Sequence, residues 1–549
     1  MSVRPAIASG PDFVPSPEQP VCLAQYIEAL ATSNPGGRLI DIDQFGRQRI
    51  TTYGALFERA NGIASRLRSI RSSASQIVLL CCEGATDYVA GAWASLFAGS
   101  DLMPCDTVAR LTDPQHFCNK LARHIDSLGN ACLLIDDAVF QTIDRCGMTA
   151  KLRPVRVAKN SISMSGGISR SHVVPPDVRQ SRLLVQTSGT TADPKIAVLG
   201  SDSLINRFFD GWNPQESVQL HNMAHHTVAG IRLLLPVGRE TVRLHPLRVA
   251  VRPKEWLDAI DHFAITDVGL STSTAKAIFQ ALKSDASPVC LDSLRRISFG
   301  AEPIVPNIVR EFLVALKTSG AGDAQISLVY SMTETGPLFR SILSMPNALS
   351  LLKADQPCLS LEQCVAGWRV RCVDDHGASV REGELGSIQV YSDRKMFSGY
   401  LNEPAPFVHD EAGHRWFDTG DLGSLNSSGL TLKGRNKSTI IVNARKITCE
   451  EIEAGLAACN SLAETMLVAA PYRTPSMATD EVAIFFVPRI RSTKAVVDLK
   501  RTIVREVSRR FGLSARKIIQ INADDIDLTV TMKVRRMALM RKYMEGKLL

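Results

Sequence analysis

The sequence predicts an α/β fold, with a large N-terminal domain of mixed and parallel sheets with helices, followed by a small α+β domain. Short apolar runs alternate with segments of helical periodicity, which is typical of parallel sheets covered by helices. The chain has 549 residues, more than one hydrophobic core usually organises. The pattern changes near residue 435, so we place the domains at residues 1–435 and 436–549.

The elements of the N-terminal part follow in order. The proline-rich residues 1–20 predict a flexible lead-in. Apolar residues recur at helical spacing in segments 21–35 and 50–70, and we expect the second helix to begin near Thr52. The continuous apolar run "QIVLLCCEG" predicts a strand buried on both faces. Residues 87–105 then predict a helix, a glycine and a further strand.

The C-terminal part has a compact pattern of its own. The strand-like run "TIIV" leads to Thr448, which forms a capping box with Glu451 and predicts the start of a helix. The strand "EVAIFFVP", a helix over residues 496–512, the strand "KIIQIN" and a basic tail follow. These elements suffice for a small α+β domain.

Composition narrows the class of protein. The net charge of +8 favours anionic ligands such as nucleotides, although a generally solvated basic surface is the plainer interpretation. No basic motif is interleaved with aromatic residues, so we expect no nucleic-acid partner. The thirteen cysteines form no CxxC pair, which favours a reducing, cytoplasmic location. We find no apolar run long enough to span a membrane and no signal peptide.

The segment "TSGTTADPK", residues 187–195, lies between the apolar runs "LLV" and "IAV". It lacks the second glycine of a Walker A loop, and a strand-like run follows its lysine in place of a helix. Its hydroxyls, its accessible backbone N–H groups and its lysine are suited to binding a polyphosphate. A polar hairpin turn is an equally good interpretation of this loop alone.

Four further stretches occur in a fixed order: "YSMTE" (330–334), "WFDTGDLG" (416–423), "GRNKSTIIVNARKITCEEIE" (434–453) and "TMKVRR" (531–536). With "TSGTTADPK" and the weaker matches "FGAEPI" and "GYLNEP", they resemble the adenylate-forming superfamily. That superfamily contains acyl-CoA synthetases, acyl-AMP ligases, adenylation domains of peptide synthetases, and luciferases. The resemblance extends over nearly the whole chain.

The resemblance implies an enzyme that uses ATP and Mg²⁺ to convert a carboxylic acid to acyl-AMP with release of pyrophosphate. The acyl group then passes to a phosphopantetheine thiol, with an acyl or peptidyl carrier protein as the favoured acceptor. Residues 1–435 would bind ATP and the acid. Residues 436–549 would form a mobile domain that carries the catalytic lysine, Lys533, and swings about a hinge at Lys437.

The resemblance also assigns the parts of ATP to particular residues. The β- and γ-phosphates fall to the loop residues Thr187, Ser188, Gly189, Thr190, Thr191 and Lys195. The adenine site falls to Gly300, Ala301, Glu302 and Tyr330. Thr333 would contact the α-phosphate and Glu334 would bind Mg²⁺, which prefers carboxylate oxygen. Asp421 would accept hydrogen bonds from the ribose hydroxyls, and Arg435 would lie near the ribose or the α-phosphate.

Each of these stretches has a plainer interpretation when taken alone. Thr333 and Glu334 would be a helix start. Asp421 would be a turn aspartate, and Lys533 one more cation in a basic tail. The ordered set favours the catalytic roles, because the plainer interpretations do not explain why the five stretches occur together.

The chain departs from the family pattern at several positions: Ala192, Ser331, Asn443, Ala444 and Met532. Four of these residues replace glycines, and Asn443 replaces a lysine that is frequent in CoA ligases. A CoA ligase therefore stays an alternative, as does a non-catalytic, regulatory nucleotide-binding protein with the same fold.

The acid-binding segment is expected in "MAHHTVAGI", residues 223–231. Adenylation domains for α-amino acids carry an aspartate there that pairs with the amine. This chain instead has His226, Thr227 and Gly230 and no carboxylate, which favours an acid without a free α-amine. A histidine hydrogen-bonded in the interior is the alternative interpretation of His226.

Overall fold

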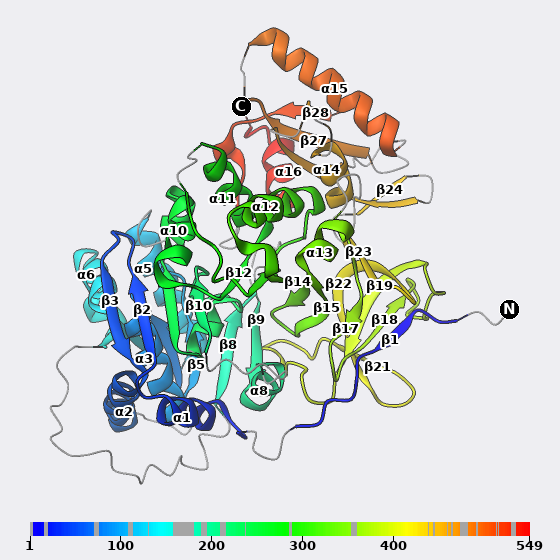
Figure 1. The fold of residues 1–549 in the computed structure, drawn as a ribbon. Coiled ribbons are helices and arrows are strands. Elements are labelled where there is room, and N and C mark those ends of the chain that lie inside the picture. Colours follow the sequence, from blue (N-terminus) through cyan, green and yellow to red (C-terminus); the bar gives the residue numbers. More distant parts are fainter. Residues whose placement is uncertain are drawn as a thin grey trace.

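The computed structural model describes most of the chain. The described residues are 4–15, 20–70, 76–107, 113–129, 131–157, 181–187, 195–208, 216–235, 238–284, 288–352, 359–436, 439–442, 445–457, 459, 461–462, 465–472, 481–489, 492–511, 513, 515, 517–528 and 534–548. A large N-terminal part contains three sheets, and a smaller C-terminal part lies at its upper end in Figure 1.

The first sheet is parallel along most of its width, in the order β17-β15-β14-β13-β12-β10-β11-β2-β3. Its strands are β2 (Arg38–Ile42), β3 (Gln48–Thr52), β10 (Val218–His221), β11 (Glu240–Leu244), β12 (Asp267–Leu270), β13 (Arg296–Phe299), β14 (Gln325–Met332), β15 (Gly336–Ser344) and β17 (Gln363–Cys364). The antiparallel pairs lie at its two edges. At one edge β14 pairs with β15 and β15 pairs with β17, and at the other edge β2 pairs with β3.

The second sheet has the order β20-β9-β8-β5-β4-β6-β7. Its strands are β4 (Ile77–Cys81), β5 (Asp101–Pro104), β6 (Ala131–Ile135), β7 (Val155–Arg156), β8 (Arg182–Gln186), β9 (Ile196–Gly200) and β20 (Gly399–Tyr400). Strands β4 to β8 are parallel, and β9 and β20 are antiparallel to their neighbours. The strand expected within residues 76–84 and the strand expected at the end of residues 87–105 are confirmed as β4 and β5.

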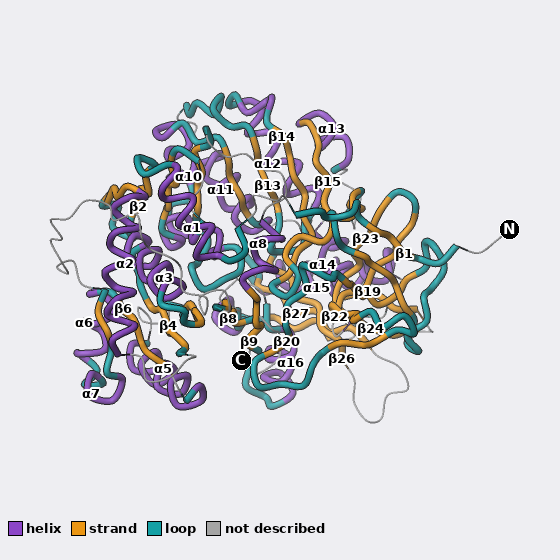
Figure 2. Tube along the Cα trace, turned by 90° about the horizontal axis from the view of Figure 1, so that it is seen from below, coloured by secondary structure: helices purple, strands orange, loops and turns teal. Residues whose placement is uncertain are grey.

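Helices cover and separate these two sheets. They are α1 (Leu23–Ser33), α2 (Tyr53–Ile70), α3 (Ala85–Phe97), α5 (Pro114–Leu128), α6 (Asp137–Arg145), α7 (Thr149–Leu152), α8 (Ser201–Phe208), α9 (Pro246–Val251), α10 (Lys254–Phe263), α11 (Thr272–Ser284), α12 (Pro306–Thr318) and α13 (Met345–Leu351). Helix α3 contacts both β2 and β4, and Figure 2 shows α2 and α3 between these strands. The expected start of the second helix near Thr52 is confirmed, because α2 begins at Tyr53.

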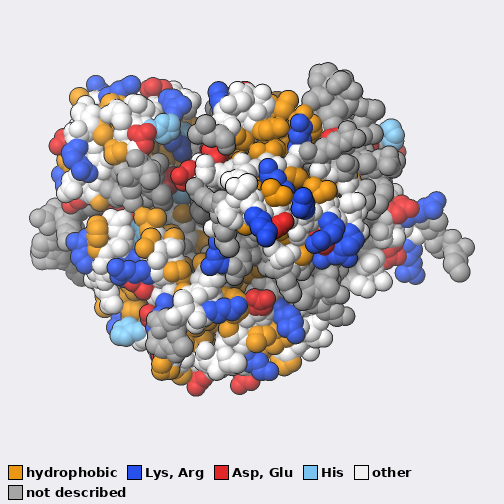
Figure 3. All heavy atoms as spheres, turned by 90° about the horizontal axis from the view of Figure 1, so that it is seen from above, with side chains coloured by type: hydrophobic (Ala, Val, Ile, Leu, Met, Phe, Trp, Pro, Cys, Tyr) orange, Lys and Arg blue, Asp and Glu red, His pale blue; other side chains and the backbone are white. Residues whose placement is uncertain are grey.

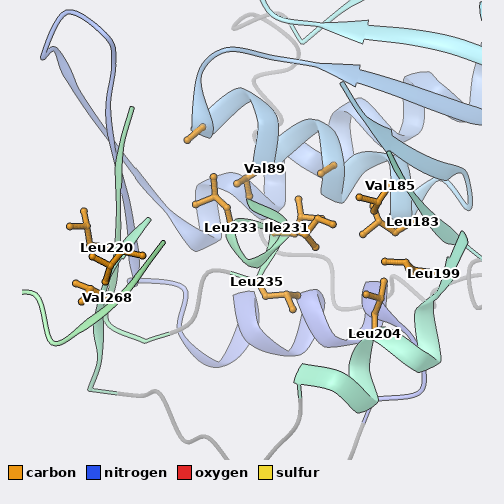
Figure 4. Packing of buried hydrophobic residues seen from close by; sticks show 14 of the residues in the cluster. Val89, Leu183, Val185, Leu199, Leu204, Leu220, Ile231, Leu233, Leu235 and Val268 are labelled. Atoms are coloured by element: carbon orange, nitrogen blue, oxygen red, sulfur yellow. The ribbon is translucent and has the colours of Figure 1, made fainter. Parts of the chain in front are cut away.

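The main hydrophobic core fills the space between the two sheets. Figure 4 shows Val89 of α3 and Ile231 in the middle of this core, with Val185 of β8 on one side and Leu220 of β10 on the other. All four side chains are almost fully buried. This packing fixes the ends of the two sheets relative to each other, so loops from both can contribute to one site.

The third sheet is antiparallel, in the order β1-β18-β19-β22-β23-β16, with β21 on β22. Its strands are β1 (Ile7–Ser9), β16 (Ser360–Leu361), β18 (Arg369–Val373), β19 (Leu385–Tyr391), β21 (Phe407–His409), β22 (Arg415–Asn426) and β23 (Gly429–Arg435). The prediction of a flexible lead-in over residues 1–20 is wrong where β1 forms. Strand β1 is an edge strand, a position that tolerates neighbouring prolines, and it pairs with β18.

The C-terminal part has hydrophobic clusters of its own. Its elements are β24 (Thr439–Val442), β25 (Arg445–Thr448), α14 (Cys449–Ala457), β26 (Met466–Tyr472), β27 (Glu481–Val487), α15 (Thr493–Phe511), β28 (Lys517–Gln520), the 3₁₀ helix η5 (Ala523–Asp525) and α16 (Arg536–Met544). The expected capping box is confirmed, because Glu451 N donates to Thr448 Oγ1 and Thr448 N donates to the Glu451 carboxylate, both at 3.2 Å.

Basic side chains are spread among hydrophobic and acidic ones on the face that Figure 3 shows. Every described cysteine is a free thiol, as expected for a chain without a disulfide framework. The described part of the chain contains no helix that is long and apolar enough to cross a membrane.

Candidate active site

The turn between β14 and β15 carries Thr333 and Glu334. Strand β14 ends at Met332 and β15 begins at Gly336, so the two residues lie in the link of an antiparallel pair. The alternative interpretation of "TE" as a helix start is therefore wrong. Ser331, which stands where the family pattern has a glycine, lies next to an irregularity in the pairing of the two strands.

Asp421 is the centre of a buried polar group beside this turn. It lies in β22 directly opposite Arg435 of β23, whose Nε is 2.9 Å from Asp421 Oδ1. The Tyr330 hydroxyl donates to Asp421 Oδ2 at 2.6 Å. Strand pairing within the third sheet thus brings Asp421 to Arg435, and the side chain of Tyr330 reaches Asp421 from the first sheet.

The electrostatics of this group are consistent with its geometry. The negative charge of Asp421 raises the pKa of Arg435. Burial, followed by the Asp421 charge, raises the pKa of Tyr330 well above its ordinary value. Tyr330 therefore stays protonated and donates, and Asp421 accepts from a phenol and a guanidinium together.

Glu334 is buried, and its turn is held from two sides. The Tyr400 hydroxyl donates to Glu334 Oε1 at 2.9 Å. Arg207 of α8 donates from Nη2 to the Glu334 carbonyl at 2.5 Å and from Nη1 to the Thr333 carbonyl at 3.2 Å. Its Nε donates to the Lys395 carbonyl at 2.8 Å. Backbone and carboxylate are therefore fixed by different residues.

Lys195 lies at the end of the predicted phosphate loop. Thr187 N donates to the Lys195 carbonyl at 2.8 Å, and the flanking strands β8 and β9 are antiparallel. This strand–loop–strand frame confirms that the loop is not a Walker A loop. The Lys195 ammonium forms an ion pair with Glu403 and lies 4.7 Å from the centre of the Tyr400 ring.

Several predicted residues lie outside the described residues, and their roles stay predictions. They are Ser188, Gly189, Thr190, Thr191, Lys437 and Lys533. The same holds for four of the departures from the family pattern: Ala192, Asn443, Ala444 and Met532.

The loop after β13 contains Gly300, Ala301 and Glu302. Ala301 has a φ of +65°, a backbone conformation that alanine rarely adopts. The Glu302 carboxylate accepts from Ser273 N at 3.1 Å and from Ser273 Oγ at 2.9 Å, at the beginning of α11. Glu302 thus caps a helix, and the expected adenine contact of this loop stays a prediction.

The predicted acid-binding segment forms a turn between β10 and the 3₁₀ helix η2 (Gly230–Leu234). His226 is buried, with its Nδ1 3.8 Å from Asp106 Oδ1. Thr227 Oγ1 donates to the Ala224 carbonyl and accepts from Gly230 N, which closes the turn. A Cβ at Gly230 would meet the Ala224 carbonyl oxygen at 2.0 Å, so this position requires glycine.

Burial lowers the pKa of both histidines in this turn, and the Asp106 carboxylate only partly opposes the effect at His226. Neither Nε2 atom has a hydrogen-bond partner within the described residues. The prediction of an interior, hydrogen-bonded histidine is therefore not met at the His226 Nε2. Burial thus favours the neutral form of both imidazoles, although charged side chains lie near each of them: Glu83 and Arg243 near His225, and Asp106 and Lys120 near His226.

In the C-terminal part, Arg536 joins α16 to α14. Its guanidinium binds Glu450 at 3.1 Å and Glu453 at 2.6 Å. Glu453 also accepts from Ala469 N at 2.8 Å. Arg536 lies three positions after Lys533, so this cluster anchors the chain just beyond the predicted catalytic lysine.

The described residues contain no group of three or more side chains that could hold a metal ion alone. Glu334 still fits Mg²⁺, which often takes one carboxylate and completes its ligands with phosphate and water. Its carboxylate and the Lys195 ammonium contact the same aromatic side chain, Tyr400, so the predicted ligand of Mg²⁺ and the predicted phosphate-binding lysine adjoin.

Sequence analysis missed three residues of this site: Arg207, Tyr400 and Glu403. Tyr400 and Glu403 belong to "GYLNEP", which matched the family pattern weakly and carried no role. Arg207 lies in an ordinary helical segment, and no signal in the sequence indicates that its guanidinium reaches the turn that carries Thr333 and Glu334.

Comparisons with known proteins identify the family and the fold of this chain. The model of the AMP-binding enzyme family matches residues 28–401. The curated relatives include an atromentin synthetase of Tapinella panuoides, 25% identical over 523 residues, which are 90% of this chain and 54% of the relative. An inactive atromentin synthetase of Paxillus involutus is also 25% identical, over 91% of this chain and 54% of the relative. The chain thus spans about half the length of these relatives.

Among solved structures, McyG A-PCP complexed with phenylalanyl-adenylate has a TM-score of 0.83 at 21% identity, over 99% of this chain and 85% of that chain. This likeness shows that the two chains share the fold, with a large N-terminal and a small C-terminal domain. Because the family model matches more than half of the sequence, the chain belongs to the family of AMP-binding enzymes, in the adenylate-forming superfamily.

Proposed function

We propose that this chain uses ATP to convert a carboxylic acid to acyl-AMP, with release of pyrophosphate, and then transfers the acyl group to a phosphopantetheine thiol. The observation that carries the proposal is the arrangement of Asp421 between Tyr330 and Arg435, next to the turn of Thr333 and Glu334. This arrangement provides an acceptor for a ribose diol beside residues suited to the α-phosphate and its metal.

The reaction joins two anions, so the site must neutralise charge and hold the acid in line with the α-phosphate. Asp421 would bind the ribose and Thr333 the α-phosphate. Lys195 and the loop before it would hold the departing pyrophosphate. Lys533 would place its ammonium between the carboxylate and the α-phosphate, where negative charge concentrates in the transition state.

Glu334 would hold Mg²⁺, which supplies positive charge against the phosphates. The chain's own contribution is to keep that carboxylate oriented through the Tyr400 hydroxyl. The remaining neutralisation comes from side chains of the protein, with Lys195 at the outer phosphates and Arg435 beside the ribose.

The proposed acid lacks a free α-amine. The turn expected to line its pocket contains two buried histidines whose pKa values are lowered by burial, and the turn itself holds no carboxylate. The Asp106 carboxylate faces His226. An ammonium group would have to be desolvated without a carboxylate from this turn to pair with it, so we favour a neutral acyl chain.

The favoured acceptor is a carrier protein, and free CoA is the alternative. The large part, 1–435, would bind ATP and the acid, and residues 436–549 would bring either Lys533 or the thiol channel to the site by moving about Lys437. The solved structure of McyG is described as A-PCP. A chain of the same fold is therefore joined to a carrier protein there, which supports a carrier protein as the acceptor in this case.

A non-catalytic, nucleotide-binding role is the second candidate. It is favoured by the relatives described as inactive atromentin synthetases and by the glycines that Ala192 and Met532 replace. Alanine at a position that needs a positive φ is strained by about 1 kcal/mol, which would slow a phosphate loop without preventing ATP binding.

The experiment that tests the proposal is ATP–pyrophosphate exchange with Mg²⁺ and a panel of carboxylic acids. We expect exchange with at least one acid that has no α-amine. Lys533→Ala should lower exchange by about 1,000-fold or more and leave ATP binding intact, because the ammonium acts in the transition state. The matched control is Lys542→Ala, which removes a lysine of α16 that pairs with Asp527.

Exchange with no acid would contradict the proposal and support the regulatory role. A Lys533→Ala protein that loses ATP binding would contradict the role of Lys533 alone. Where exchange is found, incubation with CoA or with a phosphopantetheinylated carrier protein then identifies the acceptor.

A further inference from the structure

Tyr400 occupies an unusual position between the two charged ends of the phosphate site. It lies in the short strand β20, which pairs with β9 so that Tyr400 is opposite Ala197, two residues after Lys195. Its hydroxyl donates to Glu334 Oε1 at 2.9 Å, and its ring centre lies 4.7 Å from the Lys195 ammonium. One side chain therefore contacts both the carboxylate and the ammonium through different chemical groups.

The two contacts use separable properties of the phenol. The phenol hydroxyl is a donor at neutral pH, and it donates to the Glu334 carboxylate. The ring face attracts the Lys195 cation through its quadrupole, an interaction that does not need the hydroxyl. Tyr400→Phe removes the first contact alone, and Tyr400→Leu removes both.

The backbone of the Glu334 turn is fixed independently of Tyr400. Arg207 is buried beneath the turn and donates to the carbonyls of Thr333 and Glu334. Burial lowers the pKa of Arg207 to about 9, so its guanidinium is still charged at neutral pH. Loss of the Tyr400 hydroxyl should therefore leave the turn in place and free only the carboxylate to rotate.

Among the described residues, the Tyr400 hydroxyl is the one hydrogen-bond donor that contacts the Glu334 carboxylate. A single donor on Oε1 fixes the rotation of the group and leaves Oε2 available as a ligand. The ion pair between Lys195 and Glu403 holds the ammonium over the same ring. One tyrosine side chain thus contacts the carboxylate through its hydroxyl and the ammonium through its ring.

We propose that Tyr400 is a positioning residue that orients Glu334 for a divalent cation and, through its ring, holds Lys195 for the outer phosphates of the same nucleotide. This inference rests on the proposed function, because it takes Glu334 as the metal ligand. Tyr400 then links the metal site to the triphosphate site. Because only its hydroxyl contacts Glu334, loss of the hydroxyl should weaken metal binding more than nucleotide binding.

The test is the affinity for Mn²⁺, measured by electron paramagnetic resonance on the full chain with α,β-methylene-ATP, which cannot release pyrophosphate. Tyr400→Phe should weaken Mn²⁺ binding to this complex about tenfold, the effect of one hydrogen bond to a charged group. It should leave metal-free nucleotide binding within twofold of wild type. Tyr400→Leu should in addition weaken metal-free nucleotide binding a few-fold.

Two further variants show whether the effect passes through Glu334. In a Glu334→Gln background, Tyr400→Phe should cause no additional loss of Mn²⁺ affinity, because the two changes disturb the same interaction. The matched control is Tyr391→Phe, which removes a hydroxyl bound to Asp393 in the third sheet and should leave Mn²⁺ binding unchanged.

An unchanged Mn²⁺ affinity in Tyr400→Phe would overturn the inference, as would an equal loss in the Glu334→Gln background. The proposed function has a separate readout in pyrophosphate exchange. If the wild-type chain binds Mn²⁺ and nucleotide but exchanges no pyrophosphate, only the proposed catalytic activity is contradicted. The role of Tyr400 is then still decided by the Mn²⁺ affinity of its variants. A wild-type chain that binds no Mn²⁺ with nucleotide overturns both.

Discussion

The end of the site predicted to bind the nucleotide and the end predicted to bind the acid differ in how their polar side chains are paired. At the nucleotide end, Asp421 is paired with a guanidinium and a phenol, and Glu334 accepts a hydrogen bond from a second phenol. At the acid end, His225 and His226 are buried with lowered pKa values, and their Nε2 atoms find no partner in the described residues. Charged side chains are paired at one end, whereas at the other end burial disfavours the charged form of the two imidazoles.

This contrast follows from what each end is proposed to bind. A polyphosphate with its metal needs charges whose positions are set before it arrives, because reorienting them would cost binding energy. An acyl chain needs a pocket that does not favour water or an amine. Changes at the nucleotide end should therefore affect ATP and metal, and changes at the acid end should affect which acid is accepted.

Among the changes that compare the two ends, Asp421→Asn is expected to have the largest effect. The substitution removes the negative charge that Arg435 and Tyr330 face, and two hydrogen bonds to a charged group are each worth about 1.5 kcal/mol or more. We expect kcat/KM for ATP in pyrophosphate exchange to fall about 100-fold, with the KM of the acid within threefold of wild type.

The matched control for this variant is Asp418→Asn, an exposed aspartate of the same strand whose carboxylate accepts from Gly420 N. It should leave both substrates within twofold of wild type. If the KM of the acid rose by as large a factor as kcat/KM for ATP fell, the result would contradict the separation of the two ends.

A smaller effect is expected from His226→Leu at the acid end. Replacing a buried imidazole near Asp106 by an alkyl group changes the shape and polarity of the pocket, and such changes discriminate by about tenfold. We expect the ranking of acids in the exchange panel to shift by about that factor toward more apolar acids, with the KM of ATP unchanged. A shift in the KM of ATP without a change in acid ranking would contradict this assignment, and His409→Leu, at an exposed histidine, is the control.

The sequence predicted the architecture well because its signals were local. The strand at 76–84, the helix that begins at Tyr53 and the capping box at Thr448 each depend on neighbouring residues, and all three are confirmed. The lead-in was predicted wrongly because β1 has little pattern of its own and is defined by its pairing with β18.

The site was predictable in part. Asp421, Tyr330 and Arg435 were singled out from three separate stretches, and the sheets bring them into contact. Tyr400 could not be assigned a role, because its contact with Glu334 depends on the pairing of β20 with β9, some 200 residues apart. The roles of Lys533 and of the loop residues stay predictions for the exchange and binding measurements.

The smallest expected effect concerns pH and also lies at the acid end. His221 ends β10, just before the acid-binding turn, and its Nε2 lies 3.2 Å from Gln219 Oε1. Burial, followed by the charge of Arg232, lowers its pKa from 6.5 to about 4. Between these values the unfolded chain binds more protons at this residue than the folded chain does, so its contribution to stability is present above pH 6.5 and is lost as the pH falls toward 4.

The corresponding measurement is urea unfolding of the wild-type and His221→Gln chains at pH 5, 7 and 8. From pH 7 to pH 5, the free energy of unfolding should fall by about 1 kcal/mol more in the wild type than in the variant, after allowance for the partial exposure of the imidazole. Between pH 7 and pH 8 the two should change in parallel, because the imidazole is then neutral in both the folded and the unfolded state. An equal loss at pH 5 would show that His221 can be protonated in the folded chain, and the suppression of charge would then be confined to the turn that holds His225 and His226.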